Sequence, residues 1–204
     1  MFLKAIRKQF NHLVFGGNGS GKTTWLIEVA IAYAEANEAK RVLWVLPDDS
    51  ESKLDAIPEI ELDDLPYFIG MAKIIVQDDS FFKEFLAFFS DKDNNFDGLV
   101  ICDDCGVFIA RRSNNILSLF RRRRQLNVDF IWSFHGFNTE VPKSFITYVN
   151  SIFIMETSDN PDWTIKQLAE EKQIEFKEKY DKIQNFVKKG IKYKCEELIL
   201  RDLN

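Results

Sequence analysis

A glycine-rich stretch that runs into a lysine and a threonine is the most chemically specific feature of the chain. Residues 16–23, GGNGSGKT, fit the pattern G-x-x-x-x-G-K-[ST] without a mismatch. Glycine permits the positive φ angles that turn successive backbone N–H groups toward one anion, and it places no Cβ in the way. The lysine is expected to reach the β- and γ-phosphates of ATP, and the threonine hydroxyl to bind Mg²⁺. We therefore predict a phosphate cradle formed by Gly16, Gly17, Asn18, Gly19, Ser20, Gly21, Lys22, Thr23 and Thr24.

Two consecutive carboxylates offer chemistry that this loop lacks. The apolar run LVIC at 99–102 ends in Asp103 and Asp104. Hydrolysis of a nucleotide needs a metal ion to neutralise developing charge and a group to orient the attacking water. Asp103 is predicted to join Thr23 in the Mg²⁺ shell, and Asp104 to orient the water. The alternative is that the acidic pair only caps the next helix.

A histidine closes a later apolar run. His135 is one of only two histidines in the chain and follows DFIWSF at 129–134. If this strand lies beside the strand that leads into the glycine-rich loop, His135 should face the γ-phosphate. The alternative is an ordinary surface histidine.

The elements that would position these residues alternate along the chain. Apolar runs typical of strands buried on both faces lie between helical patterns, one of which contains a phenylalanine stripe at 81, 85, 88 and 89. This alternation predicts right-handed βαβ units in a three-layer α/β fold with a mainly parallel sheet, and ligands at the carboxyl ends of the strands. The predicted strands are 12–15, 41–46, 73–76, 99–102, 129–134 and 151–155, and the helices are 24–36, 81–89 and 113–126.

The last part of the chain is predicted to be helical. Pro161 suits the first position of a helix that begins near Asn160, and Gly190 suits a stop after Lys189. Residues 191–200 are a candidate edge strand. Because no repeat or linker interrupts the pattern, we predict one domain, 1–204, with a C-terminal helical segment at about 160–204.

Bulk properties narrow the class of protein. A chain of 204 residues with a net charge of −5 suits one domain and argues against nonspecific coating of nucleic acid. No run of about 18 apolar residues occurs, and the basic start has no hydrophobic run, which predicts neither a membrane span nor a secretory signal. The C-x-x-C pair Cys102 and Cys105 allows a metal or redox site, but three cysteines suit a reducing compartment. We expect a soluble, intracellular protein.

Charge is segregated into two blocks. Residues 48–64 hold eight acidic side chains against Lys53 alone, whereas Arg111, Arg112 and residues 121–124 hold six of the nine arginines. Either block can be a solvated surface, and arginine near a helix end suits the helix dipole. Four consecutive arginines, however, point in all directions around a helix, so at least one should face inward or toward a partner. Opposite charges also suit two surfaces that meet across a subunit boundary.

Taken in order, GGNGSGKT, LVICDD, RRRRQLNVDFIWSFH at 121–135 and SIFIMETSDNPDW at 151–163 resemble the FtsK–HerA superfamily of DNA-pumping ATPases. The chain is most similar to the compact genome-packaging ATPases of membrane-containing icosahedral viruses. The resemblance implies a P-loop NTPase of the RecA/ASCE-like type. It also implies a trans-acting arginine about eleven residues before a polar sensor at the end of the next strand. This pattern falls on Arg124, with Arg121 as a second candidate and His135 as the sensor. The family usually has Glu at the position of Asp104 and Gln at that of His135.

The resemblance implies a viral genome-packaging ATPase that uses ATP and Mg²⁺ and moves DNA. Its partners would be DNA, further copies in a ring, and capsid or vertex proteins, in the host cytoplasm or on the virion. Four alternatives remain: a filamentous-phage-type assembly ATPase, whose members typically carry a transmembrane helix; a cellular helicase-like or partitioning ATPase; a small-molecule P-loop kinase, with the arginines in a lid; and a nucleotide-regulated scaffold without turnover. Strand order separates kinases, in which the carboxylate strand neighbours the loop strand, from translocating ATPases, in which the sensor strand lies between them.

Overall fold

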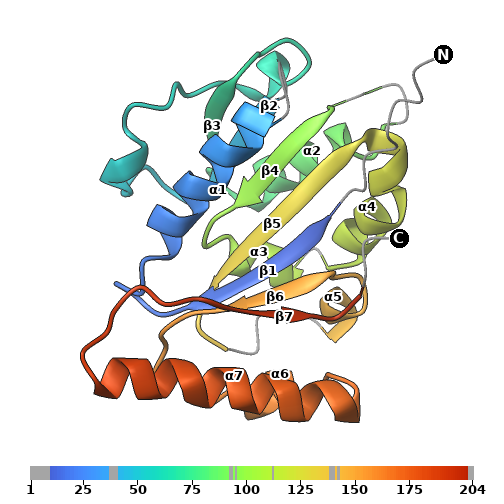
Figure 1. Cartoon of the computed structure of the whole chain (residues 1–204). Helices are drawn as coiled ribbons and strands as arrows, with labels where there is room; N and C mark the ends of the chain where they lie inside the picture. Colours follow the sequence, from blue (N-terminus) through green and yellow to red (C-terminus); the bar gives the residue numbers. More distant parts are fainter. Residues whose placement is uncertain are drawn as a thin grey trace, which may run out of the picture.

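The computed structural model describes residues 10–36, 41–91, 94, 96–111, 113–137, 141 and 143–201. A seven-stranded sheet forms its centre, in the order β3-β2-β4-β5-β1-β6-β7 (Figure 1). Neighbouring strands from β3 to β6 in this order are parallel, and β7 pairs antiparallel with β6. The strands are β1 Asn11–Gly16, β2 Arg41–Leu46, β3 Met71–Ile75, β4 Gly98–Cys102, β5 Val128–His135, β6 Ser151–Ile154 and β7 Glu196–Ile199.

Helices lie on both faces of this sheet, as predicted for a three-layer fold. They are α1 Lys22–Ala36, α2 Asp79–Phe88, α3 Gly106–Arg111, α4 Ser113–Leu126, α5 Lys143–Ile146, α6 Asp162–Ile165 and α7 Glu170–Lys188, with short 3-10 helices η1 Ser52–Leu54 and η2 Leu62–Asp64 between β2 and β3.

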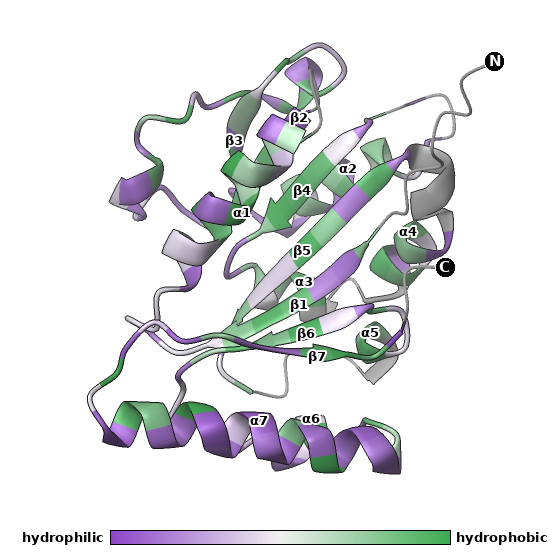
Figure 2. Cartoon of the chain, in the orientation of Figure 1, coloured by the Kyte–Doolittle hydropathy of each residue, from purple (hydrophilic) through white to green (hydrophobic). Residues whose placement is uncertain are grey.

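Along the central strands, alternate side chains pack into two different hydrophobic cores, one on each face of the sheet. On one face, strand residues such as Val14 and Trp44 pack with Leu26 of α1. On the other face, residues such as Phe15 and Val100 pack in a core that also contains buried residues of α2, α3, α4, α5, α6 and α7. The central strands are accordingly hydrophobic along most of their length (Figure 2). This burial on both faces explains why continuous apolar runs predicted the strands well.

The six predicted parallel strands are all present, with ends that differ by no more than two residues, and α4 has the predicted bounds. The candidate edge strand 191–200 is shorter than expected, because β7 is Glu196–Ile199. α3 and α5 were not predicted. The phenylalanine stripe of α2 is shifted: Phe82, Phe85 and Phe89 are buried with Leu86, whereas Phe81 and Phe88 are only partly buried. Asp78 caps this helix by accepting a hydrogen bond from the backbone N–H of Phe81, so the helix begins two residues earlier than expected.

The predicted C-terminal helix is two helices, which corrects the sequence-based expectation. α6 ends at Ile165, and α7 begins after Ala169, whose backbone is extended with ψ 149°. The turn between them is held because Gln173 donates its side-chain N–H to the carbonyl of Leu168, a buried residue. Gly190 does end α7 with φ +73°, and the edge strand β7 follows.

Strand order places the sensor strand β5 between the loop strand β1 and the carboxylate strand β4. This is the order expected for translocating ATPases rather than for kinases. The carboxyl ends of these three parallel strands therefore meet at one edge of the sheet. Within the described residues, no helix has the length and apolar character needed to cross a membrane.

Candidate functional site

The glycine-rich loop joins β1 to α1 and has the backbone shape that its composition predicts. Gly19 and Gly21 adopt φ angles of +75° and +89°, which favour glycine. At Gly16 the constraint is space, because an added Cβ would lie 2.6 Å from Ser20 Oγ. The first turn of α1 contains no acidic residue. No side chain of that turn therefore competes with an anion for the N-terminal N–H groups of the helix.

A cavity of about 430 Å³ opens above this loop. The structure brings the loop together with both carboxylates of the Asp103–Asp104 pair and with His135, as the sequence predicted. Of the predicted cradle, Ser20 and Thr24 border a neighbouring cavity instead, and Gly16 lies at the end of β1. The cradle residues that line the main cavity are Gly17, Asn18, Gly19, Gly21, Lys22 and Thr23.

The two predicted metal ligands are adjacent. Thr23 Oγ1 donates to Asp103 Oδ2 at 3.2 Å. The other carboxylate oxygen, Asp103 Oδ1, is buried and accepts no hydrogen bond of ordinary geometry, although Ser133 is close enough to favour the ionised carboxylate. Such an oxygen gains from a further group that binds there. Mg²⁺ is usually held by one or two carboxylates together with substrate phosphates. The pair Thr23 and Asp103 at the edge of a phosphate-sized cavity therefore fits Mg²⁺.

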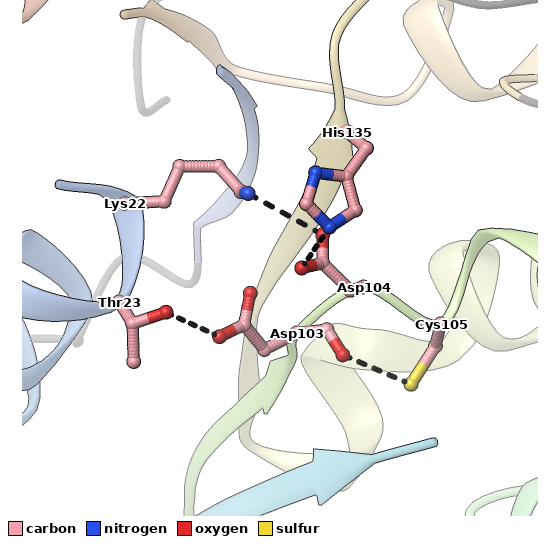
Figure 3. A network of polar contacts seen from close by, with 6 residues as sticks. All are labelled: Lys22, Thr23, Asp103, Asp104, Cys105 and His135. Atoms are coloured by element: carbon pink, nitrogen blue, oxygen red, sulfur yellow. Dashed lines mark hydrogen bonds and ion pairs between the residues drawn. The ribbon is translucent and has the colours of Figure 1, made fainter. Parts of the chain in front are cut away.

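Asp104 lies between the loop lysine and the sensor histidine (Figure 3). Its Oδ1 is 3.5 Å from Lys22 Nζ, and its Oδ2 is 2.8 Å from Nε2 of His135. Asp104 follows β4 with a φ angle of +55°, which is uncommon outside glycine. His135 ends β5 in register with Gly16 of β1. The three polar side chains thus come from the ends of three neighbouring elements and converge at the cavity.

Burial makes Asp103 unusual. Its side chain is only 4% exposed. Burial raises the pKa of Asp103, and the neighbouring Asp104 raises it further, against the opposite effects of Ser133, Lys22 and Thr23. A pKa that is higher in the folded protein than in the unfolded chain means that ionisation destabilises the fold. This cost is complete above the folded pKa and disappears as the pH falls below the unfolded one.

We therefore expect Asp103→Asn to stabilise the protein at pH 7 in metal-free buffer, because the amide carries no charge to desolvate. The gain should disappear as the pH falls below the pKa of an aspartate in the unfolded chain, because Asp103 is then protonated in both states. The free energy of unfolding, measured in urea with EDTA at pH 7, checks this. Asp63→Asn, at an exposed position on η2, is the matched control and should change little. An Asp103→Asn protein that is less stable than the wild type would contradict the expectation.

A lysine that sequence reasoning did not assign to the site reaches it from the acidic block. Lys53 of η1 borders the cavity and donates to Thr24 Oγ1 at 3.0 Å. Asp48 and Glu51 also line the cavity, so the start of the 48–64 stretch is more than a solvated surface. The one signal for Lys53 in the sequence was its isolation among acidic residues.

The candidate arginines lie far from this cavity. α4 ends at Leu126, and Asn127 turns the chain into β5 with φ +52°. The strand then runs away from α4, so the C-terminal end of α4 lies at the opposite end of β5 from His135 (Figure 1). Arg121 Nε donates to Tyr148 Oη at 3.1 Å, with the guanidinium over the tyrosine ring. The side chain of Arg124 lies outside the part of the structure that is described.

The C-x-x-C pair gives no support to a metal or redox site. Cys102 and Cys105 are free and buried. Burial raises the pKa of both thiols well above the ordinary value, which disfavours the reactive thiolate. Cys105 Sγ donates to the carbonyl of Val45. Among the described residues, no group of three or more His, Cys, Asp or Glu side chains is placed to hold a metal ion.

Comparisons with known proteins show which solved structures share this fold. No protein-family model and no curated protein matches the chain. The DNA-packaging ATPase B204 from Sulfolobus turreted icosahedral virus superposes with a TM-score of 0.66 at 13% identity, over 95% of this chain and 94% of that one. B204 of Sulfolobus turreted icosahedral virus 2, a genome-packaging NTPase in complex with AMPPCP, gives a TM-score of 0.65 at 14% identity, over 83% and 87%. The chain has the fold of these ATPases.

EssC, ATPases 2 and 3, from Geobacillus thermodenitrificans is a more distant structural match. Its TM-score is 0.51 at 13% identity, over 78% of this chain and 34% of that one. The predicted fold class, a mainly parallel α/β P-loop fold with a helical C-terminal part, is thereby confirmed. The fold is therefore shared with a viral packaging ATPase and with ATPase modules of EssC.

Proposed function

We propose that this protein is a viral genome-packaging ATPase that couples ATP hydrolysis to DNA translocation into a capsid. The observation that carries the proposal is the placement of β5 between β1 and β4, which brings His135 to Asp104 beside the phosphate loop. Supporting it, the chain and the packaging ATPase B204 match over nearly their whole lengths. The same strand order argues against the small-molecule kinase.

Each polar group of the site has a role in the proposed hydrolysis. Lys22 binds the β- and γ-phosphates. Thr23 and Asp103 would hold Mg²⁺, which would neutralise charge on the phosphates. Lys22 pairs with Asp104 in this structure. Arrival of the phosphates offers Lys22 a stronger partner, so Asp104 is released to orient water and accept its proton. His135 stabilises Asp104 and faces the γ-phosphate.

Asp104→Asn should leave ATP bound and slow hydrolysis by roughly 10² or more, the range for loss of a positioned base. The amide keeps the size and the contact to His135 but cannot take a proton. Asp104→Glu, which restores the residue usual in the family, is the matched control and should retain turnover. Single-turnover hydrolysis and ATP affinity, measured separately, check this. Wild-type turnover in Asp104→Asn would mean that Asp104 only caps the next helix and does not act on water.

We further infer that the protein acts as a homo-oligomer, in a ring, on DNA and with capsid or vertex proteins, in the host cytoplasm or on the virion. The acidic stretch 48–64 and the arginines of α3 and α4 are the surfaces proposed to meet across the subunit boundary. Their opposite charge suits a contact that steers assembly. The C-terminal end of α4 lies at the other end of β5 from the cavity, which supports a role for the arginines there in a neighbouring subunit.

DNA-stimulated ATP hydrolysis is the test of the proposed function. We expect duplex DNA to raise the steady-state rate several-fold at low salt, with the effect falling as ionic strength rises. Lys22→Ala protein is the control for contaminating ATPase. Hydrolysis that is indifferent to DNA would contradict the proposal, and phosphate transfer to a small acceptor molecule would favour the kinase.

A further inference from the structure

A second cavity adjoins the phosphate cavity on the far side of the glycine-rich loop. It has a volume of about 340 Å³, within the range of sites for small molecules. Gly19, Gly21 and Lys53 border both cavities. The Asp103–Asp104 pair and His135 do not border the second one. The two cavities therefore form adjoining compartments along the start of α1, one polar and catalytic, the other outside the reacting groups.

The walls of this second compartment are largely apolar. Trp25 extends from the first turn of α1, and its ring lies against Phe153 of β6, with the centroids 4.7 Å apart. Met155, just after β6, is buried and lines the cavity. Tyr193 comes from the loop between α7 and β7, which crosses the start of α1 (Figure 1). Two aromatic side chains from distant parts of the chain thus border one small cavity.

Tyr193 has an unfavourable backbone conformation. Its φ angle is +60°, a left-handed conformation that is uncommon for a bulky residue. Its side chain is 69% exposed, so burial does little to offset the strain. The ring nevertheless lies over the phosphate loop, because a methyl group added at Gly21 would come within 2.6 Å of Tyr193 Cδ1. Strained, exposed residues of this kind concentrate at ligand clamps.

We propose that this compartment binds the base of the nucleotide, with Tyr193 as a clamp that closes over it and Trp25 as the opposite wall. The inference rests on the proposed binding of ATP and adds the residues that hold the base. If the phosphates occupy the loop, the ribose and the base extend past Thr24 into the second cavity. Lys53, which donates a hydrogen bond to Thr24, borders both cavities along this path. A nucleotide base stacked on Tyr193 would cover part of its exposed ring, and bases stack well on aromatic rings.

Comparing ATP with inorganic tripolyphosphate isolates the base, because the two share the phosphates. In the full-length wild-type protein with Mg²⁺, ATP should bind at least tenfold more tightly than tripolyphosphate. Tyr193→Gly removes the ring while permitting the φ angle at no steric cost. It should weaken ATP binding roughly tenfold, the scale of one aromatic stack, and change tripolyphosphate binding less than about twofold. Tyr193→Phe should bind both ligands like the wild type. Tyr67→Ala, at another exposed tyrosine, is the matched control.

Tryptophan fluorescence gives a second readout. ATP, but not tripolyphosphate, should change the emission of Trp25, and the change should vanish in Trp25→Phe. Equal weakening of both ligands by Tyr193→Gly would overturn the clamp, because the loop would then act on the phosphates. Equal affinity of wild-type protein for both ligands would overturn it too. Failure to bind either would overturn the nucleotide site itself. All these measurements omit DNA, so a failure of DNA stimulation is a separate result.

Discussion

Lys22→Ala is expected to abolish detectable ATP turnover. Lys22 is the first residue of α1, and its side chain is 5% exposed at the floor of the phosphate cavity. A charge-assisted contact to the transferred phosphoryl group in such a sheltered site contributes far more than one in water. Its loss should lower kcat by roughly 10³ or more. Steady-state release of phosphate from ATP, with Mg²⁺ and DNA present, is the measurement.

A second lysine that borders the cavity makes this prediction sharper. Lys53 also borders the cavity, but it comes from an exposed turn and its Nζ is engaged with Thr24. It is therefore not positioned to replace Lys22 at the γ-phosphate. Lys83→Ala, at an exposed position on α2, is the matched control and should keep wild-type turnover. Turnover that survives Lys22→Ala would remove the phosphate-loop interpretation, since that interpretation assigns the contact to the transferred phosphoryl group to Lys22.

Local patterns predicted the phosphate loop and the strands because their causes are local. Positive φ at Gly19 and Gly21 is a property of the glycines themselves. Strands buried on both faces have apolar runs whichever neighbours they have. By contrast, α3 and α5 have six and four residues. Helices this short depend on packing rather than on intrinsic propensity, so no pattern in the sequence marked them.

Contacts between distant segments lay beyond sequence reasoning. Asp104 and His135 were each predicted in the site, but nothing in the sequence indicated that they bind one another. Likewise, Lys53 and Tyr193 reach the loop from segments whose own patterns are an acidic stretch and the residues after a helix stop. Their positions follow from strand order and from the path of the chain after α7. These are properties of the assembled fold.

The position of α4 constrains what its arginines can do. β5 has eight residues, so its ends are about 23 Å apart. α4 ends just before the first residue of β5, and the phosphate cavity lies beyond the last. An arginine side chain cannot span that distance to the cavity of its own subunit. Any arginine near the end of α4 that acts on ATP must therefore act on a neighbouring subunit, unlike the lid arginine of a kinase.

Arg124→Ala is therefore expected to bind ATP normally and to lose about 10³ or more in hydrolysis, the scale of an arginine finger. Arg121→Ala is the matched comparison. Because Arg121 is already held by Tyr148 of its own chain, its loss should cost much less. ATP affinity and turnover are measured on each variant. If Arg124→Ala hydrolyses ATP like the wild type while Arg121→Ala does not, the finger is Arg121.

Mixing two inactive variants tests whether the arginine acts between subunits. An Arg124→Ala subunit keeps a loop that binds ATP, and a Lys22→Ala subunit keeps the arginine. Where the second supplies its arginine to the first, one complete site forms, so mixed oligomers should recover a measurable fraction of the wild-type rate. The control is the double variant Lys22→Ala, Arg124→Ala, mixed with either single variant. All subunits of such a mixture lack the same residue, so no complete site forms and no hydrolysis should be recovered. Stable mixed oligomers without recovered hydrolysis would contradict an Arg124 that acts between subunits, because an interface that brings one arginine to the next site repeats at every contact of a ring.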